Sequence, residues 1–535
     1  MGIPYYFSYL VKTHGHIIQK WTKGTHPVHN LFLDCNSIVY DVVRKLNFAV
    51  LTDTVAGSII HNVILAIEEY VALIQPSHLV YIAFDGVAPL AKLQQQRERR
   101  YKSSYQNQLT KDVFKNTSVD PFNTVAITPG TSFMAELNAK ITRHFTASAS
   151  APAYLVSDSS EYGEGEHKLF AYLRNHPELR DQTHMVYGLD ADLIMLSINH
   201  LPLHPHIYLF RETPAFIQSL DSSLEPDGNY CLDIPELSRV IMENMNSSTE
   251  SVTRIYDYIF ICFFLGNDFM PHFPALNIRT GGVDKVLNAY KATVGATNEV
   301  MTDGKTICWR NVRKWVAFLA DREEQYILDE VKLRDKRERI HYPEDTPELI
   351  LKKFENVPSQ QRDLEKYIQV GRPNWRRRYY DALFWLDVND ERKKQISVNY
   401  LEGLEWTLKY YTTGCADWRW CYHYNYPPLL SDLIQYIPYF ETEFIPNGLP
   451  ANPVNPLVQL SYVLPRSALS LLPEPLYKKL VQEHDDWYPT DCEFVWAFCK
   501  YFWEAHVDLP EIDMDELEAL VLPFVSAAAA PPIPS

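Results

Sequence analysis

Three short apolar segments of the sequence each lead directly into an aspartate. They are residues 30–34 (NLFLD), residues 79–85 (LVYIAFD) and residues 184–189, which Asp190 follows. Between the first two, apolar residues recur at helical spacing over residues 59–74. Strands that alternate with helices predict an α/β fold, in which a parallel sheet carries helices on both faces. Ligands of such sheets bind beyond the carboxyl ends of the strands, where all three aspartates are expected to lie.

The character of the sequence changes near residue 300. Residues 300–400 are charge-rich and follow a helical pattern, and residues 404–440 are dense in aromatic side chains. We therefore expect an α/β domain over 1–300, a mostly helical, aromatic-rich block over 301–525 that wraps it, and a tail over 526–535. The tail (SAAAAPPIPS) is of low complexity, which predicts disorder.

Composition excludes several classes of protein. Apolar residues make up 46% and charged residues 22% of the 535 residues, which is typical of a globular chain. The eight cysteines form no CxxC pair, so neither a zinc knuckle nor a disulfide framework is expected. The longest apolar run, residues 258–265, is shorter than the roughly 20 residues that span a bilayer, and no signal sequence opens the chain. We expect an intracellular protein without a membrane partner.

Seven acidic residues stand at strand ends or beside glycines. They are Asp34, Asp85, Glu164, Glu166, Asp190, Asp192 and Asp268. Buried carboxylates are unfavourable unless they are paired or bound to metal, and hard oxygen ligands suit Mg²⁺ or Mn²⁺. Two such ions about 4 Å apart can activate a water and stabilise the leaving oxygen in phosphodiester cleavage. Any one of these acids alone is more simply a cap or a solvated residue, but the seven together predict a metal site.

A cationic helix face is predicted directly after Asp85. Pro89 suits a helix start, and four side chains then follow at i, i+4, i+7 and i+8 on one face. They are Lys92, Gln96, Arg99 and Arg100. Arginine donates to phosphate through two parallel hydrogen bonds and lysine supplies a point charge. The net charge of −17 argues against a broad nucleic-acid surface but allows a local basic pocket; a solvated helix surface is the alternative.

Several motifs resemble those of one nuclease family. The most specific are GEGEHK at residues 163–168 and YGLDADLIML at residues 187–196. Others lie at residues 1–4, 33–38, 84–100, 127–131, 262–274, 376–380, 406–411, 418–426 and 488–490. In this order they resemble the XRN family of 5′→3′ exoribonucleases, within the flap-endonuclease-like (PIN-like) nuclease superfamily. The resemblance covers nearly the whole chain and is weakest at about 211–250 and 295–370.

The resemblance implies a role for each matching residue. The seven acids fall on the family's metal-binding and catalytic carboxylates, and the four residues of the basic face fall on its pocket for the 5′-monophosphate of RNA. An aromatic residue six positions after Asp34 stacks on the terminal base in the family; here it is Tyr40 where the family has His. The opposing tryptophan is Trp418 or Trp420, with Trp418 favoured. Packing inside the core is the alternative for each of these rings.

Two departures from the family pattern bear on the prediction. Leu90 stands where the family has arginine, which weakens phosphate or backbone contacts. The long carboxyl-terminal region of cytoplasmic members and the Cys/His knuckle of nuclear members are both missing, so we expect a compact form such as a virus or a unicellular organism encodes. We expect it in the cytoplasm, of the host if the source is viral, with the nucleus as the alternative.

The function implied by the resemblance is processive 5′→3′ degradation of single-stranded RNA. The substrate would carry a 5′-monophosphate, the products would be 5′-mononucleotides, and two Mg²⁺ or Mn²⁺ ions would assist hydrolysis in RNA decay. A capped or triphosphate end would fit the pocket poorly. A flap-type endonuclease that acts on DNA and an inactive RNA-binding scaffold are the alternatives, and seven intact acids argue against the scaffold. The sequence points to no particular protein partner.

Overall fold

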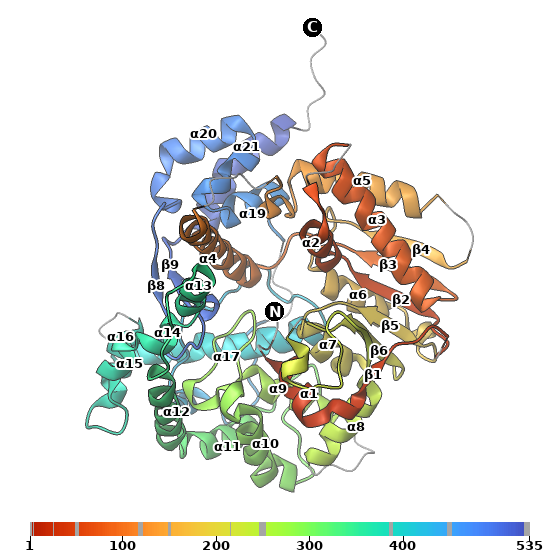
Figure 1. Cartoon of the computed structure of the whole chain (residues 1–535). Coiled ribbons are helices and arrows are strands. Elements are labelled where there is room, and N and C mark those ends of the chain that lie inside the picture. The colour runs from red at the N-terminus through yellow and green to blue at the C-terminus, as the bar shows by residue number, and fades with distance from the viewer. Residues whose placement is uncertain are drawn as a thin grey trace.

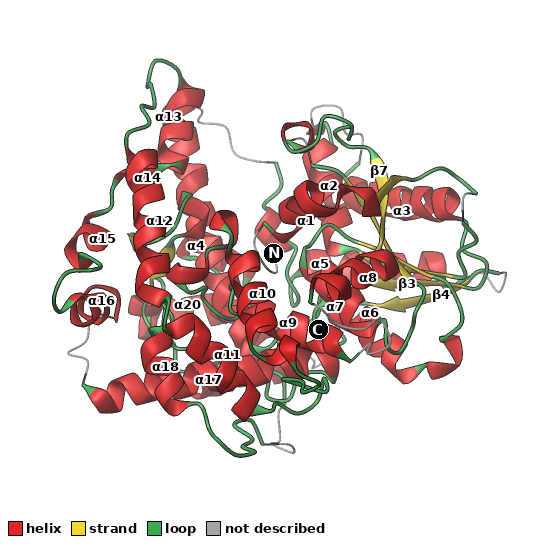
Figure 2. Ribbon diagram, turned by 90° about the horizontal axis from the view of Figure 1, so that it is seen from below, coloured by secondary structure: helices red, strands yellow, loops and turns green. Residues whose placement is uncertain are grey.

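The three apolar segments that lead into aspartates lie side by side in a seven-stranded sheet (Figures 1 and 2). The structure is a computed structural model that describes residues 3, 5–24, 26–48, 53–115, 121–147, 151–214, 216–245, 253–384, 389–446 and 452–528. The strand order within these residues is β1-β7-β6-β5-β2-β3-β4. The strands are β1 (Ile18–Lys20), β2 (Asn30–Asp34), β3 (Leu79–Ala83), β4 (Ala153–Ser157), β5 (His184–Tyr187), β6 (Ile207–Glu212) and β7 (Asn229–Asp233).

The five strands from β6 to β4 run parallel, and β7 and β1 pair antiparallel at one edge. Asn30 of β2 stands opposite Leu79 of β3 and His184 of β5, so these three strands end at the same edge of the sheet. The predicted α/β class is confirmed, as a mixed sheet that is mostly parallel. Strand β3 ends at Ala83, before the predicted residue 85, so Asp85 lies just beyond the strand.

Helices cover both faces of the sheet, as predicted. Leu31 and Leu33 pack beneath α2 (Asn36–Lys45), α3 (Val55–Ile74) and α5 (Ser132–Phe145). Phe32 points the other way, toward α6 (Gly165–Asn175), α7 (Asp192–His200) and α9 (Arg254–Phe263). Among the described helices, α3 alone has the length and composition of a membrane-spanning helix, and its Ile59 and Val63 are buried in the core of the sheet lobe.

The chain after α9 is mostly helical, as predicted, and forms a second lobe beside the sheet (Figures 1 and 2). Its helices are α10 (Gly282–Ala292), α11 (Trp309–Ala320), α12 (Glu323–Glu338), α13 (Pro347–Glu355), α14 (Val357–Gln360), α15 (Asp363–Ile368), α16 (Trp375–Phe384), α17 (Asp390–Thr412), α18 (Leu430–Tyr436), α19 (Pro456–Val463), α20 (Glu474–Glu483) and α21 (Met514–Ala528). Strands β8 (Glu493–Val495) and β9 (His506–Asp508) pair with each other.

The two lobes share one hydrophobic core. A single cluster of buried side chains runs from Phe32 in the sheet to Trp406 on α17. The border predicted near residue 300 falls between α10 and α11, which pack on each other, and it stays a prediction. Of the predicted tail over 526–535, the first three residues end α21 and the others lie outside the described residues.

Helix α4 (Leu90–Phe114) connects the lobes. It begins one residue after Pro89, as predicted, and crosses to the carboxyl-terminal segment of the chain. The Arg97 guanidinium donates to the carbonyl oxygens of Trp487 (2.8 Å) and Pro510 (2.7 Å) there. In Figure 1, α4 faces α2 across the middle of the molecule, which places its first turns beside the carboxyl edge of the sheet.

Candidate active site

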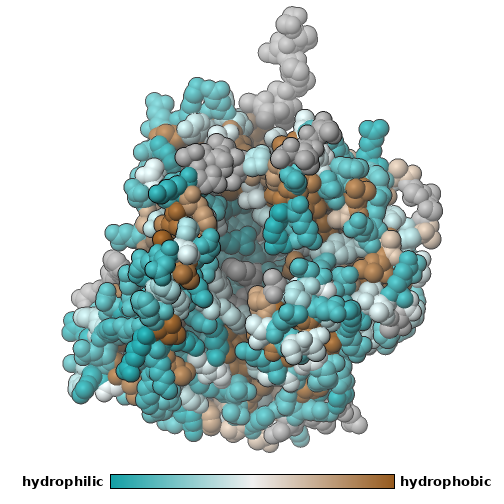
Figure 3. Space-filling model, viewed as in Figure 1, coloured by the Kyte–Doolittle hydropathy of each residue, from teal (hydrophilic) through white to brown (hydrophobic). Residues whose placement is uncertain are grey.

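A cavity of about 610 Å³ lies at the carboxyl edge of the sheet, against α4. Figure 3, viewed as Figure 1, shows a hollow with hydrophilic walls in the middle of the molecule. Nine of the residues predicted from the sequence line this cavity: Asp34, Tyr40, Asp85, Lys92, Gln96, Arg99, Glu164, Glu166 and Asp190. The structure therefore brings together side chains from five separate segments of the sheet lobe.

The strand-end aspartates are held by backbone and amide contacts. Asp34 is the last residue of β2. The Asn36 side chain donates from Nδ2 to Asp85 Oδ2 (2.6 Å), and the Gly165 amide donates to Asp85 Oδ1 (2.7 Å). A Cβ at Gly165 would stand 2.8 Å from Asp34 Oδ1, so only glycine lets the start of α6 approach both carboxylates.

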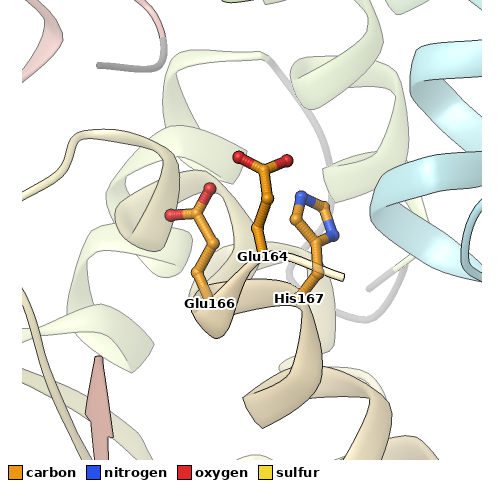
Figure 4. Close-up of side chains that lie close together, drawn as sticks. All are labelled: Glu164, Glu166 and His167. Carbon is orange, nitrogen blue, oxygen red and sulfur yellow. The ribbon is translucent and has the colours of Figure 1, made fainter. Parts of the chain in front are cut away.

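Glu164 and Glu166 project from the first turn of α6 in the same direction (Figure 4). Ligand atoms of these two residues and of His167 lie within 4.8 Å of one another. Burial lowers the pKa of His167 well below its ordinary value, so the imidazole is neutral and able to bind a metal. His167 belongs to the motif GEGEHK, but it was not predicted as a metal ligand from the sequence.

The helical lobe reaches this cluster through two adjacent tyrosines on α17. The Tyr410 hydroxyl donates to Glu164 Oε1 (2.8 Å), and the Tyr411 hydroxyl donates to Asp192. Burial raises the pKa of both tyrosines well above the ordinary value, so both remain donors. The sequence prediction missed these residues, because aromatic residues at helical spacing signal core packing and the bonded partners are 246 and 219 residues apart.

Asp268 joins the cluster from the turn after α9. Gly266 in this turn has a φ of 85°, in the left-handed region that glycine adopts without strain. Lys92 then pairs through Nζ with Asp268 Oδ2 (2.6 Å) and with Glu164 Oε2 (2.6 Å). All seven predicted acids are thus in one electrostatic neighbourhood, although Asp192 and Asp268 do not line the cavity itself.

Crowded carboxylates shift one another's acidity. Burial, with the nearby charges of Asp268 and Asp190, raises the pKa of Asp192 to about 7. Burial also raises the pKa of Glu166 well above its ordinary value and outweighs the Lys92 ion pair in raising that of Glu164. Burial acts the same way on Asp268, but there the nearby positive charges, led by Lys92 and joined by Arg99, together outweigh it and lower the pKa. Oxygen donors that repel one another in this way fit a divalent cation.

The predicted basic face is divided between two environments. Gln96 and Arg99 line the cavity, and Lys92 is bound to two of the acids rather than exposed on the helix. Arg100 does not line the cavity, and its Nη2 donates to Thr128 Oγ1 (2.6 Å). Burial lowers the pKa of Arg100 to about 10, and its Nη1 has no hydrogen-bond partner among the described residues.

The three rings predicted to stack on a base lie in different places. Tyr40 is 40% exposed and lines the cavity. Trp418 is half-buried against Tyr162 (centroids 6.4 Å apart) and lies outside the cavity lining. Trp420 is only 7% exposed and stacks on Trp406, so it presents no open face. Burial therefore argues against Trp420 as a base-stacking residue, while Trp418 stays a prediction.

Several lining residues were not expected from the sequence, and two of them are large side chains far from the predicted motifs. Trp503 lies in the carboxyl-terminal segment and stacks on Tyr5 at 6.2 Å. Arg211 is the next-to-last residue of strand β6, inside the region where the family resemblance is weakest. No motif marks either position.

Curated proteins resemble the chain over nearly all of its length. The 5′-3′ exoribonuclease 2 homolog of Drosophila melanogaster is 28% identical over 92% of this chain and 65% of its own, and 5′-3′ exoribonuclease 2 of Gallus gallus is 27% identical over 92% and 64%. The 5′-3′ exoribonuclease 1 of Saccharomyces cerevisiae is 24% identical over 98% of this chain but 43% of its own. The chain thus spans two thirds or less of these relatives.

A solved structure, "Crystal Structure of T5 D15 Protein Co-crystallized with Metal Ions", covers 57% of this chain and 88% of its own at 10% identity. Its TM-score of 0.27 is too low to support a conclusion about the fold. Two family models match in chain order: "XRN 5′-3′ exonuclease N-terminus" over residues 1–213, and "Xrn1 helical domain" over residues 250–347 and 344–524. Together they include all seven acids and both tyrosines of the site. The chain belongs to the XRN family of 5′-3′ exonucleases.

Proposed function

We propose that this protein degrades 5′-monophosphorylated single-stranded RNA from the 5′ end by metal-assisted hydrolysis. The observation that carries the proposal is the shared cavity, in which carboxylates of a kind that suits metal lie beside Gln96 and Arg99, whose donors suit phosphate. Its volume of about 610 Å³ lies within the roughly 300–1,000 Å³ of ordinary small-ligand sites, enough for one terminal nucleotide. The relatives named 5′-3′ exoribonucleases support the same activity.

The seven carboxylates would hold the metal, with His167 as a further neutral donor. The chemistry that bound metal supplies, from two Mg²⁺ or Mn²⁺ ions in our proposal, is activation of water and stabilisation of the leaving oxygen. Asn36 and the α17 tyrosines orient individual carboxylates by donating to them. Such contacts fix the direction of the lone pairs that the metal requires.

The α4 side of the cavity would hold the terminal phosphate. Arg99 and Gln96 supply donors, and the positive charge of Lys92 lies at the boundary between the phosphate and the acids. Tyr40 would stack on the terminal base, since its exposed ring lines the same cavity. A cap or a triphosphate would add bulk and charge beyond the single phosphate that Gln96 and Arg99 would bind.

An assay with end-defined RNA tests the proposal. A 3′-labelled single-stranded RNA with a 5′-monophosphate should disappear to mononucleotides in Mg²⁺, without intermediate lengths, and remain intact in EDTA. Asp192→Asn should remove cleavage, while Asp181→Asn, a matched change on the exposed surface, should not. Internal cuts in a flap DNA would favour the endonuclease alternative, and binding without cleavage would favour the scaffold.

A further inference from the structure

Strand β6, the outermost of the five parallel strands on one side, carries a cation near its carboxyl end, where β5, β2 and β3 lead to acids. Strand β6 runs parallel to β5, with Phe210 opposite Tyr187. Arg211 is therefore level with Gly188, two residues before Asp190, at the same carboxyl edge as Asp34. Along this edge the order is Asp85 with the start of α4, then Asp34, then Asp190, then Arg211. The acids stand between the α4 cations and Arg211.

Arg211 is almost completely buried but weakly bonded. Its side chain lines the cavity and is 6% exposed. The guanidinium carbon lies 3.8 Å from the centre of the Phe7 ring, a cation–π contact. The hydrogen bond from its Nε to the Glu212 carbonyl oxygen is long at 3.5 Å, and Nη1 has no partner among the described residues.

Two other buried cations near this site hold firmer partners than Arg211 does. Lys92 pairs with two carboxylates at 2.6 Å, and Arg97 donates to two carbonyl oxygens. A buried guanidinium without such partners is unfavourable unless an anion completes it. Burial lowers the pKa of Arg211 to about 10, so it is still charged at neutral pH. An anionic ligand in the cavity would provide the missing partner.

We propose that Arg211 binds a phosphodiester group of the RNA backbone, distinct from the 5′-terminal phosphate. The inference rests on the proposed function and adds a second anchor to it. The terminal phosphate belongs to the α4 side, and β6 lies three strand spacings from β3, roughly 14 Å across the sheet edge. Two cationic sites on opposite sides of the acids match two phosphates of one strand. The RNA strand would thereby be held on both sides of the phosphodiester bond that is cleaved at the acids.

The competing role for Arg211 is a countercharge to Asp190. A countercharge would affect the metal requirement and the stability, whichever phosphates the RNA carries. If Arg211 binds a phosphate instead, the effect of replacing it should depend on the charge of one particular phosphodiester in the RNA. Methylphosphonate linkages separate the two roles, because they remove the charge of a single phosphodiester and leave the others.

The experiment measures the dissociation constant of 5′-monophosphate RNA in the Asp192→Asn background, which prevents cleavage. Arg211→Met should weaken binding roughly tenfold to hundredfold, and Arg211→Lys less. A methylphosphonate at one internal position should weaken the parent by a similar factor and Arg211→Met little further. The preference for a 5′-monophosphate over a 5′-hydroxyl should persist in Arg211→Met and be lost in Arg99→Ala. Arg180→Met is the exposed control, whose affinity should not change.

Three results would overturn the inference. Arg211→Met could bind every RNA as the parent does, or its effect could multiply with that of each methylphosphonate in turn. Its weaker binding could also disappear at saturating Mg²⁺, which is the behaviour of a countercharge. Thermal melting and Arg211→Lys guard against misfolding as the cause. If the parent itself binds no RNA, the proposed function fails with the inference; if the parent binds and Arg211→Met matches it, the inference alone fails.

Discussion

The sheet lobe and the helical lobe meet at one cavity but contribute to it differently. The sheet lobe and the turn that leads out of α9 supply all seven carboxylates, and short-range geometry places most of them: the end of β2, the first turn of α6 and the turn after α9. The helical lobe supplies hydroxyl groups from Tyr410 and Tyr411, which reach the acids only because α17 packs against α7 and α9. One lobe thus carries the ligands and the other fixes their direction.

Asp192 and Tyr411 lie on either side of the contact between the lobes. A variant of each residue therefore tests what its own lobe contributes to the site. Removing the carboxylate should produce the largest effect. We expect Asp192→Asn to lower the rate of RNA cleavage by more than about two orders of magnitude, beyond the loss typical of groups that only orient a ligand. Single-turnover cleavage at saturating RNA measures this. A residual rate within tenfold of the parent would remove Asp192 from the metal-binding set.

Removing the hydroxyl on the helical side should produce a smaller effect of a different kind. Tyr411→Phe keeps the ring but loses the hydrogen bond to Asp192. We expect roughly tenfold to hundredfold weaker Mg²⁺ activation, with recovery at high Mg²⁺. Tyr400→Phe on the same helix is the control, since its hydroxyl donates to the Pro271 carbonyl oxygen and not to an acid. If the activity of Tyr411→Phe and of the parent depended on Mg²⁺ concentration in the same way, the helical lobe would contribute only packing to the site.

Tyr40 tests whether the sheet lobe also supplies the base-stacking ring. Tyr40→Phe and Tyr40→His should stay active, because each keeps a flat aromatic face. Tyr40→Ala should lose about 1–3 kcal/mol of RNA affinity, the contribution of one stacked base, and should remove fewer nucleotides per binding event. Its melting temperature should change little, because the ring is 40% exposed. A lower melting temperature with unchanged processivity would mean that Tyr40 is a packing residue.

The smallest effect concerns stability without metal. Since the pKa of Asp192 is raised to about 7, the folded protein binds a proton that the unfolded chain releases above its ordinary pKa of 3.8. Between these two values the stability should fall as the pH rises, because unfolding releases protons. In EDTA we expect the melting temperature to drop by a few degrees from pH 5 to pH 7.5 through this group.

Mg²⁺ should reverse this trend. Metal binding needs ionised carboxylates, so the melting temperature should rise more on adding Mg²⁺ at pH 7.5 than at pH 5. The Asp192→Asn variant is the control and should show a smaller pH dependence. Equal stabilisation by Mg²⁺ at both pH values would contradict the hypothesis that Mg²⁺ binding requires these carboxylates to be ionised.

Features that depend on local chain geometry were predictable from the sequence. The strand β2 has the predicted bounds, α4 starts directly after Pro89, and the acids at strand ends share one edge because parallel strands end together. Strands β1 and β7 were not predicted, since their pairing at the sheet edge is antiparallel and β1 has three residues. The basic face of α4 was predicted as one surface, but packing sends Lys92 to the acids and Arg100 to Thr128.

By itself the sequence determined the α/β class, the acids and their common edge, because period and spacing act over a few residues. Only the tertiary structure decided which side chains complete the site. Tyr411 reaches Asp192 across 219 residues, Trp503 lines the cavity from the carboxyl-terminal segment, and Arg211 is brought to the edge by the pairing of β6 with β5. Contacts of this kind depend on how elements that are distant in the sequence pack together. Such packing produces no periodic pattern in the sequence that could predict it. The same packing buried Trp420 and left Tyr40 exposed, although the resemblance suggested base stacking for both rings.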